Sequence, residues 1–238
     1  MEKSYDNSTI NIRESVFARS VSNLIHEKFL DYVGKTPIGG RILDIGTGNG
    51  YILREIKKRF PERYELIGVD SSPSMLDKAR SIDKTIEYLL ADNNNLPFSK
   101  GYFSTATAKN VTRFSSEELG RVLQEEGLFV FREYGKGKGL VEIAQLFPDR
   151  LIRSRKPDYY VTSLNKAGFE NINLEQFILQ RQYTQNELLE IVQMFPFIEN
   201  LDNSDLEKIK DLFREKEIIN VTSDPFILTV RRKSGCMM

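Results

Sequence analysis

The sequence has very little of the material from which disulfide frameworks, metal centres and polyanion-binding surfaces are built. Its 238 residues include one cysteine, Cys236, and one histidine, His26. A single cysteine excludes an internal disulfide and a cysteine metal site, and it is typical of a reducing compartment. We therefore expect no bound metal. The 34 lysine and arginine residues equal the 34 aspartate and glutamate residues, and this zero net charge argues against nucleic acid as a partner.

Long apolar runs are also missing. No stretch approaches the length of a membrane span, and the first 15 residues, MEKSYDNSTINIRES, lack the apolar core of a secretion signal. We therefore expect a cytoplasmic protein without membrane contact. The length suits one α/β domain with insertions, and it is sufficient to bury a substantial core.

What the chain does contain is an alternation of strand and helix patterns. Apolar residues at helical spacing predict an N-terminal helix over 16–33. Strand patterns follow at 41–45, 65–69, 85–90, 102–108 and 127–134, with helices at 51–60, 73–80 and 116–124 between them. The later chain has helical patterns at 160–167, 185–194 and 204–215 and strand patterns at 172–180 and 226–231. This order predicts an α/β fold with a doubly wound, mostly parallel sheet of seven strands and helices on both faces.

A glycine-rich turn follows the first predicted strand, where Arg41 to Gly50 reads RILDIGTGNG. Glycine is needed where a backbone turns sharply into a helix or approaches a ligand closely. A nicotinamide-binding fingerprint would need its third glycine at position 51, which is Tyr51. Asp44 stands two residues before the first glycine. A carboxylate at this place would not help to bind a pyrophosphate, but it would attract a cationic ligand. The turn therefore indicates a site for a small, cationic molecule, and the alternative is a tight turn that binds nothing.

Two further acids follow strand patterns. Asp70 ends the run Leu66-Ile67-Gly68-Val69-Asp70, where a carboxylate can accept both hydroxyls of a ribose. Asp92 comes just after the third predicted strand and opens a polar loop that ends in Leu-Pro-Phe. Each has a structural alternative, because Asp70 could cap the helix that opens at Pro73 and Asp92 could simply form a turn.

Together these segments resemble the class I (Rossmann-like) S-adenosylmethionine-dependent methyltransferases, small-molecule type, and the resemblance covers roughly residues 41–134. It implies S-adenosyl-L-methionine as the methyl donor and S-adenosyl-L-homocysteine as the product. It also implies that Asp70 binds the ribose, that Met75 packs near the adenine, and that Asp92 and the Asn93 amide recognise the adenine ring. The cofactor-binding set predicted in this way is Asp44, Gly46, Thr47, Gly48, Gly50, Asp70, Ser71, Met75, Asp92, Asn93 and Lys109.

The chain departs from the family pattern at three places. The fourth strand opens with Phe103-Ser104 rather than Phe-Asp, and Gln124-Glu125-Glu126-Gly127 replaces the usual Lys-Pro-Gly-Gly before the fifth. No Asp/Asn-Pro-Pro-aromatic motif follows the fourth strand, where the sequence is Thr107-Ala108-Lys109-Asn110. Amino-group methylation of adenine or glutamine by that class of enzyme is therefore disfavoured, while no cofactor ligand is lost.

Candidates for contact with the methyl acceptor are few. Lys109 and Arg113 follow the fourth strand, where acceptors bind in such folds, although both also suit a solvated surface. His26 lies in the N-terminal helix and is the third catalytic candidate, but an exposed or capping histidine is the simpler interpretation. These three residues are the predicted catalytic set.

A second glycine-rich segment, Gly135 to Gly139, follows the fifth strand. Its amides could form an anion-binding nest, with positive charge from its two lysines and from Arg150, Arg153, Arg155 and Lys156. An acidic or phosphorylated acceptor would suit such a nest, and the alternative is a solvated turn. The preceding Arg-Glu-Tyr-Gly also resembles the Arg-Asp-Tyr-Gly of a group of transfer-RNA methyltransferases, but the basic charge expected around an RNA site is absent.

The sequence thus predicts an enzyme that methylates a small molecule by in-line displacement, without a metal. We expect one domain over 1–238, with a helical cap at 1–38, a cofactor-binding half at 39–135 and an acceptor-side half at 136–238. Inserted helices near 184–216 would fold with the N-terminal helix over the acceptor. RNA base methylation and non-catalytic S-adenosylmethionine binding are the alternatives.

Overall fold

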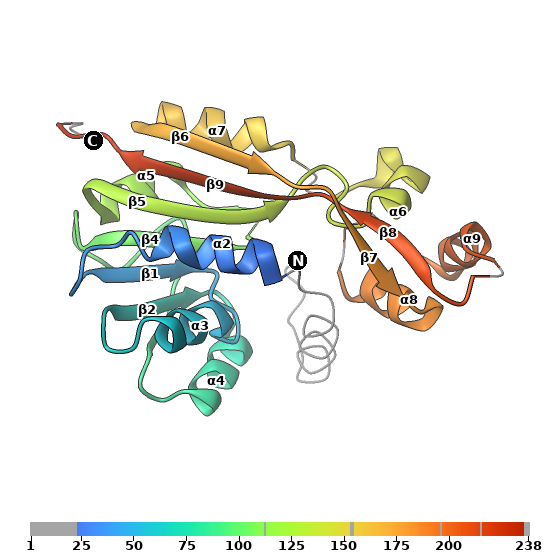
Figure 1. Ribbon diagram of the computed structural model, residues 1–238, viewed down its shortest axis with the longest axis horizontal. Coiled ribbons are helices and arrows are strands. Elements are labelled where there is room, and N and C mark those ends of the chain that lie inside the picture. Colours follow the sequence, from blue (N-terminus) through green and yellow to red (C-terminus); the bar gives the residue numbers. More distant parts are fainter. Residues whose placement is uncertain (1–22, 112, 153–154, 196, 215, 236–238) are drawn as a thin grey trace.

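The computed structural model describes residues 23–111, 113–152, 155–195, 197–214 and 216–235. Its centre is a seven-stranded sheet of order β3-β2-β1-β4-β5-β9-β6 (Figure 1). The strands are β1 (Arg41–Ile45), β2 (Glu65–Asp70), β3 (Glu87–Leu90), β4 (Phe103–Lys109), β5 (Leu123–Tyr134), β6 (Phe169–Gln176) and β9 (Pro225–Arg232). The first five run parallel, whereas β9 is antiparallel to both β5 and β6. The predicted doubly wound, mostly parallel sheet is therefore confirmed.

Helices cover both faces of this sheet. The helices α2 (Asn23–Val33), α3 (Tyr51–Arg59) and α4 (Pro73–Ile82) pack on one face, and α5 (Ser116–Val122) and α7 (Pro157–Lys166) pack on the other. Because neighbouring residues of a strand point to opposite faces, Ile42 belongs to the first core and Leu43 to the second. Both cores are apolar, and Asp44, Asp70 and Lys109 lie at or next to the carboxyl ends of their strands.

A smaller lobe extends beyond the carboxyl end of β5 (Figure 1). It contains a two-stranded sheet of β7 (Leu179–Tyr183) and β8 (Ile219–Ser223), the helices α6 (Val141–Leu146), α8 (Gln185–Met194) and α9 (Asn203–Leu212), and a 3-10 turn at Pro148–Arg150. A third apolar cluster fills it, with Ile143, Val192 and Ile219 among its members. Since Tyr134 at the end of β5 pairs with Pro225, the lobe adjoins the edge of the sheet at which ligands bind.

Most predicted elements agree with the structure to within a few residues, but two predictions need correction and two elements were missed. The single strand predicted over 172–180 is two strands in different sheets, because Phe177 makes the last bond to Pro225 and the chain then leaves for the lobe. The helix predicted over 116–124 ends at Val122, and β5 begins at once with a register irregularity. The helix α6 and the strand β8 were not predicted, and residues 16–22 of the predicted first helix lie outside the described residues.

Candidate active site

The first glycine turn joins β1 to α3 and exposes its backbone on one side. Gly48 has a φ of 56°, and a Cβ built there would meet no atom within 4 Å. Gly50 has a φ of 77°, and a Cβ there would overlap the Tyr88 hydroxyl. The turn is held from behind by a bond of 2.9 Å from the Thr47 amide to the Val69 carbonyl of β2. Its open side at Gly48 is therefore free to receive a ligand against the backbone.

Asp44 is buried directly before this turn. Its side chain is 2% exposed and accepts a hydrogen bond of 2.7 Å from the Thr107 hydroxyl of β4. Burial raises the pKa of Asp44 to about 6, and the Thr107 bond and the charge of Lys109 oppose the rise. A cationic ligand next to this carboxyl would favour its ionised form, as the sequence pattern predicts.

Asp70 connects the first turn to the second strand. One carboxylate oxygen accepts from the Gly48 amide at 2.8 Å, and the other accepts from the Ser72 amide at 2.9 Å. The cap of α4 is Ser72, whose hydroxyl accepts from the Met75 amide. The alternative in which Asp70 caps this helix is therefore wrong. Met75 is buried in the first turn of α4, and Ser71 is exposed beside Asp70.

Asp92 is exposed after β3 and shapes its own loop. One of its carboxylate oxygens accepts from the backbone amide of Asn94 at 2.9 Å and from the Asn94 side chain at 2.8 Å. Asn93 is half-buried, and its side-chain oxygen has no hydrogen-bond partner among the described residues. The turn-forming role of Asp92 is thus present, and recognition of the adenine by these two residues stays a prediction.

His26 is buried, contrary to the simpler expectation of an exposed or capping histidine. It is 5% exposed, its Nε2 lies 3.3 Å from a Glu55 oxygen, and its ring centroid is 5.6 Å from that of Tyr51. The Lys109 ammonium lies 4.7 Å from the same Tyr51 ring. The amphipathic helix α2 carries His26 on its buried face, because Ile25 and Phe29 anchor that face to the sheet.

Charge also connects these residues to Asp44. Burial lowers the pKa of His26, and the positive charge of Lys109 lowers it further. The same ammonium favours the ionised form of Asp44. The charge of Lys109 therefore acts on both the predicted cofactor turn and the histidine. Arg113, the third catalytic candidate, is exposed in the loop after β4, and no contact joins it to this cluster among the described residues.

The second glycine segment is not an open anion site. The amides of Gly137 and Gly139 donate to the two carboxylate oxygens of Asp224, each at 2.8 Å, and the Gly135 amide donates to its carbonyl at 2.8 Å. The chain's own carboxylate thus occupies the nest that the sequence predicted for an acceptor. Asp224 lies between β8 and β9, so the interaction also ties the lobe to the sheet.

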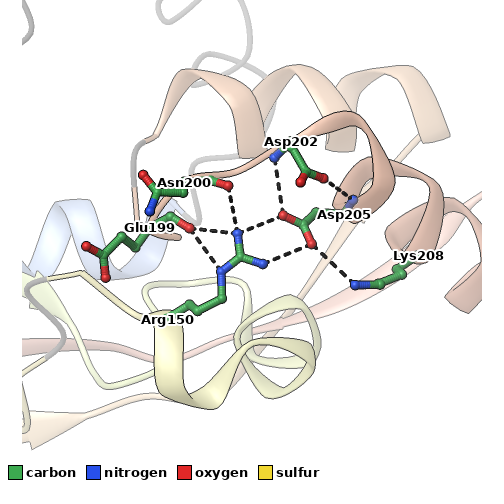
Figure 2. Close-up of polar contacts among 6 residues, drawn as sticks. All are labelled: Arg150, Glu199, Asn200, Asp202, Asp205 and Lys208. Carbon is green, nitrogen blue, oxygen red and sulfur yellow. Dashed lines mark hydrogen bonds and ion pairs between the residues drawn. The ribbon is translucent and has the colours of Figure 1, made fainter.

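Two of the basic residues assigned to this nest, Arg150 and Arg155, contact other groups. Arg150 forms a forked pair with Asp205, at 3.0 and 2.8 Å, and donates to the carbonyls of Glu199 and Asn200 (Figure 2). The Arg150 bond lowers the pKa of Asp205 to about 2. Arg155 lies 3.9 Å from the Tyr159 ring, Lys156 is exposed, and Arg153 lies outside the described residues. Arg150 therefore joins the 3-10 turn to α9 and is not an acceptor ligand.

Two buried arginines near the site were not predicted. Arg132 of β5 is 2% exposed, and Arg181 of β7 is 9% exposed. The signal for the first was a charged residue directly after the apolar run Leu128 to Phe131, at the end of a strand buried on both faces. No comparable signal marked Arg181, because β7 itself was not predicted.

The described part of the chain contains no group of three or more histidine, cysteine, aspartate or glutamate residues arranged to hold a metal ion. Within that part, no helix is both long enough and apolar enough to cross a bilayer.

The chain is similar to known methyltransferases and to related proteins that use S-adenosyl-L-methionine. A family model described as a methyltransferase domain matches residues 42–127. The chain is 27% identical over 198 residues to the carboxy-S-adenosyl-L-methionine synthase of Nitratiruptor sp., a match that covers 78% of this chain and 77% of that protein. It is 36% identical over 108 residues to the demethylmenaquinone methyltransferase of Thermotoga maritima, with 45% of this chain and 44% of that protein covered. The chain thus spans less than half the length of this second relative.

Solved structures share the fold. A phosphoethanolamine N-methyltransferase 2 of Haemonchus contortus, in complex with phosphomonomethylethanolamine and S-adenosylhomocysteine, matches with a TM-score of 0.65 at 18% identity, over 98% of this chain and 58% of that chain. A methyltransferase-like structure from Bacillus halodurans matches with a TM-score of 0.65 at 16% identity, over 86% of this chain and 97% of that chain. The family match begins in β1 and ends in β5, so it includes the turns after β1, β2 and β3 that carry most of the predicted cofactor residues. Residues 42–127 therefore match a methyltransferase domain, and the chain is an enzyme that uses S-adenosyl-L-methionine.

Proposed function

We propose that this enzyme methylates a small, negatively charged molecule bound at the carboxyl ends of β4 and β5, beneath α2. The observation that carries the proposal is the placement of His26, Tyr51 and Lys109 together, beside the buried carboxyl of Asp44. In folds of this type the cofactor lies over the first strands, and the acceptor lies where the next strands end. The ammonium of Lys109 favours an acceptor that carries negative charge.

In this proposal His26 is the general base. Its pKa is lowered by burial and by Lys109, so the imidazole is neutral at pH 7. When Nε2 donates its hydrogen to Glu55, the lone pair of Nδ1 is free to accept a proton. Nδ1 has no hydrogen-bond partner among the described residues. A base at this place would contribute about 10² to 10⁴ in rate for an acceptor that arrives protonated.

The chemical step is an in-line displacement at the cofactor's methyl group. S-adenosyl-L-methionine supplies an activated methyl, so the main task of the chain is to orient the acceptor, which contributes roughly 7 to 11 kcal/mol in well-aligned cases. The helix α2 and the lobe would exclude water above the acceptor, as the division into an N-terminal cap and an acceptor-side half predicts. The predicted contacts of Asp70, Asp92 and Asn93 to the nucleoside belong to the same proposal.

A second candidate function comes from one comparison. The match to the carboxy-S-adenosyl-L-methionine synthase extends over 198 residues, more than the whole cofactor-binding half contains. The similarity to that synthase therefore reaches into the acceptor side, and synthesis of a carboxylated cofactor is an alternative reaction for the same site. Neither RNA methylation nor non-catalytic binding gains support of this kind.

One incubation separates these functions. The protein and S-adenosyl-L-methionine are mixed with a fractionated extract of small metabolites. The nucleoside products and any methylated metabolite are then identified by mass spectrometry. The proposal predicts S-adenosylhomocysteine together with a methylated metabolite. A carboxylated S-adenosylmethionine would select the second candidate, and the absence of both products would overturn the first.

The role of His26 has its own test. His26→Gln should reduce the rate of methyl transfer at least roughly 100-fold with little change in cofactor affinity. Glu27→Gln, on the exposed side of the same helix, is the matched control and should leave the rate unchanged. An unaltered rate in His26→Gln would remove the general base from the proposal.

A further inference from the structure

Arg132 lies deep in the acceptor side and lacks a counter-ion. Arg132 as a whole is 2% exposed, and its Nε and Nη1 atoms have no hydrogen-bond partner in the described part of the chain. Among those residues it forms no ion pair. Arginine keeps its charge at neutral pH, and a buried charge without a partner carries a large desolvation cost. Such a group is stable only when something else supplies the missing acceptors.

The neighbouring acid does not supply them. Glu133 follows Arg132 in β5 and therefore points to the opposite face, where Phe129 and Phe131 belong to the other core. One Glu133 oxygen accepts from the Tyr134 amide at 2.8 Å, and the other has no partner among the described residues. Arg132 instead shares its face with Leu128 and Val130, beneath α2.

A second buried arginine, Arg181 of the smaller sheet, contacts the end of β5 at Tyr134. Arg181 follows Leu179 by two residues on β7, and Leu179 packs against the core beneath α2. Its Nη2 donates to the Tyr134 hydroxyl at 3.1 Å, its guanidinium lies 5.5 Å from the Tyr134 ring, and its Nε has no partner within the described residues. Tyr134 follows Arg132 by two residues on β5 and therefore lies on the same face of that strand, so its bond to Arg181 brings both arginines to this end of β5.

The position of this pair assigns it to the acceptor rather than to the cofactor. Arg132 is the register partner of Lys109, on the strand that lies on the far side of β4 from the glycine turn of β1. Arg181 lies farther still, in the lobe. Tyr51 contacts Lys109, the register partner of Arg132, and Tyr134 contacts Arg181, so an aromatic group lies near each end of the pair.

We infer that Arg132 and Arg181 together bind a carboxylate of the acceptor, and that this enzyme therefore selects carboxylic acids. Arg132 has two pairs of parallel donors, Nε with Nη2 and Nη1 with Nη2, and each pair can bind both oxygens of a carboxylate. One unsatisfied nitrogen, Nε or Nη1, belongs to each pair. Arg181 offers a further Nε donor, and its charge adds to the attraction for an anion. The inference rests on the proposed function only in placing the acceptor beneath α2.

Benzoate is a suitable probe, because it presents a carboxylate on a ring that can lie against the tyrosines, and benzamide is its neutral isostere. Both are titrated into the ¹⁵N-arginine-labelled chain at saturating S-adenosylhomocysteine, and the Nε–H signals are followed by NMR. Benzoate should shift the Arg132 and Arg181 signals and benzamide should not. Equal shifts with both compounds, or none with benzoate, would overturn the carboxylate site.

Variants give the second arm. Arg132→Gln should lower benzoate affinity roughly tenfold or more, and Arg132→Lys, which keeps the charge but loses the fork, should lower it less. Arg232→Gln is the matched control, because Arg232 is also 2% exposed with an unpartnered Nε among the described residues, but donates to Leu123 at the opposite end of the sheet. Benzoate affinity that falls equally in Arg232→Gln would contradict the site.

The cofactor also has a carboxylate, so its binding is measured separately. Calorimetry compares S-adenosylhomocysteine with 5′-methylthioadenosine, which lacks the amino-acid end. The inference predicts that Arg132→Gln changes neither affinity. A selective loss for S-adenosylhomocysteine would assign the arginines to the cofactor and overturn the acceptor site. Failure of the unaltered chain to bind S-adenosylhomocysteine would instead overturn the proposed function, whatever benzoate does.

Discussion

The chain has two glycine-rich turns at the carboxyl ends of parallel strands, after β1 and after β5, and only the first is open. In the turn after β1, one amide is bound to Asp70 and the backbone at Gly48 faces empty space. In the turn after β5, three amides are bound to Asp224 and the segment is packed between sheet and lobe. Alternating glycines therefore do not define a ligand site. Whether such a turn can bind a ligand depends on the acid that accepts from its amides and on the residues that surround that acid.

The largest effect that would test this difference is on stability. Asp224→Ala removes the acceptor from two buried glycine amides, each worth roughly 1 to 3 kcal/mol when unsatisfied, so we expect a loss of about 4 kcal/mol. Cofactor affinity should not change. Urea unfolding measures the loss, and Asp211→Ala, in an exposed ion pair of α9, is the control, expected to cost under about 0.5 kcal/mol. Equal costs in the two variants would show that Asp224 does not hold the second turn.

A pH titration sharpens the comparison at the first turn. The folded-state pKa of Asp44, about 6, lies above its ordinary value of 3.8, so without cofactor its contribution to stability is present below pH 4 and is lost as the pH rises through 6. The loss amounts to about 3 kcal/mol. A cationic ligand favours the ionised carboxylate, so S-adenosyl-L-methionine affinity should rise by up to about tenfold per unit between pH 5 and 6 and level off above 7.

Calorimetry across this range measures the pH dependence of cofactor affinity. Asp44→Asn should bind more weakly and show a flat profile. An unaltered pH dependence in that variant would mean that another group senses the ligand.

Asp70→Ala tests the first turn as Asp224→Ala tests the second, and its main effect should be on cofactor affinity rather than on stability. Loss of the predicted ribose acceptor and of the Gly48 bond should weaken S-adenosyl-L-methionine by about 1 to 3 kcal/mol. Asp92→Ala should weaken it by about 1 kcal/mol or less, because Asp92 is exposed and already accepts from Asn94. Affinities are read by calorimetry. A larger loss for Asp92 than for Asp70 would reverse the order of importance that the structure suggests.

The contrast between the two turns also explains which parts of the site could be predicted from the sequence. The cofactor half was predictable because its signals are local: Asp44, the glycines and Asp70 lie within 27 residues and follow directly from strand ends. The second turn looked equally suitable for a ligand, since its carboxylate comes from Asp224, 87 residues beyond Gly137. No local pattern reports such a partner.

The acceptor side was less predictable for the same reason. The burial of His26 depends on the packing of α2 over the sheet, and its partner Glu55 belongs to a different helix. Arg132 could be recognised only as a charge at the end of an apolar strand, and Arg181 depends on a strand that periodicity merged with its predecessor. Propensity and periodicity describe segments, whereas these sites arise from contacts between segments.

The most direct test of the central claim is a calorimetric titration of the unaltered chain with S-adenosyl-L-methionine and, separately, with NAD. The open turn after β1, with Asp44 buried behind it and no glycine at position 51, predicts one bound S-adenosyl-L-methionine per chain and no measurable heat with NAD. Binding of NAD as tight as that of S-adenosyl-L-methionine would contradict the assignment of this turn to the methyl donor.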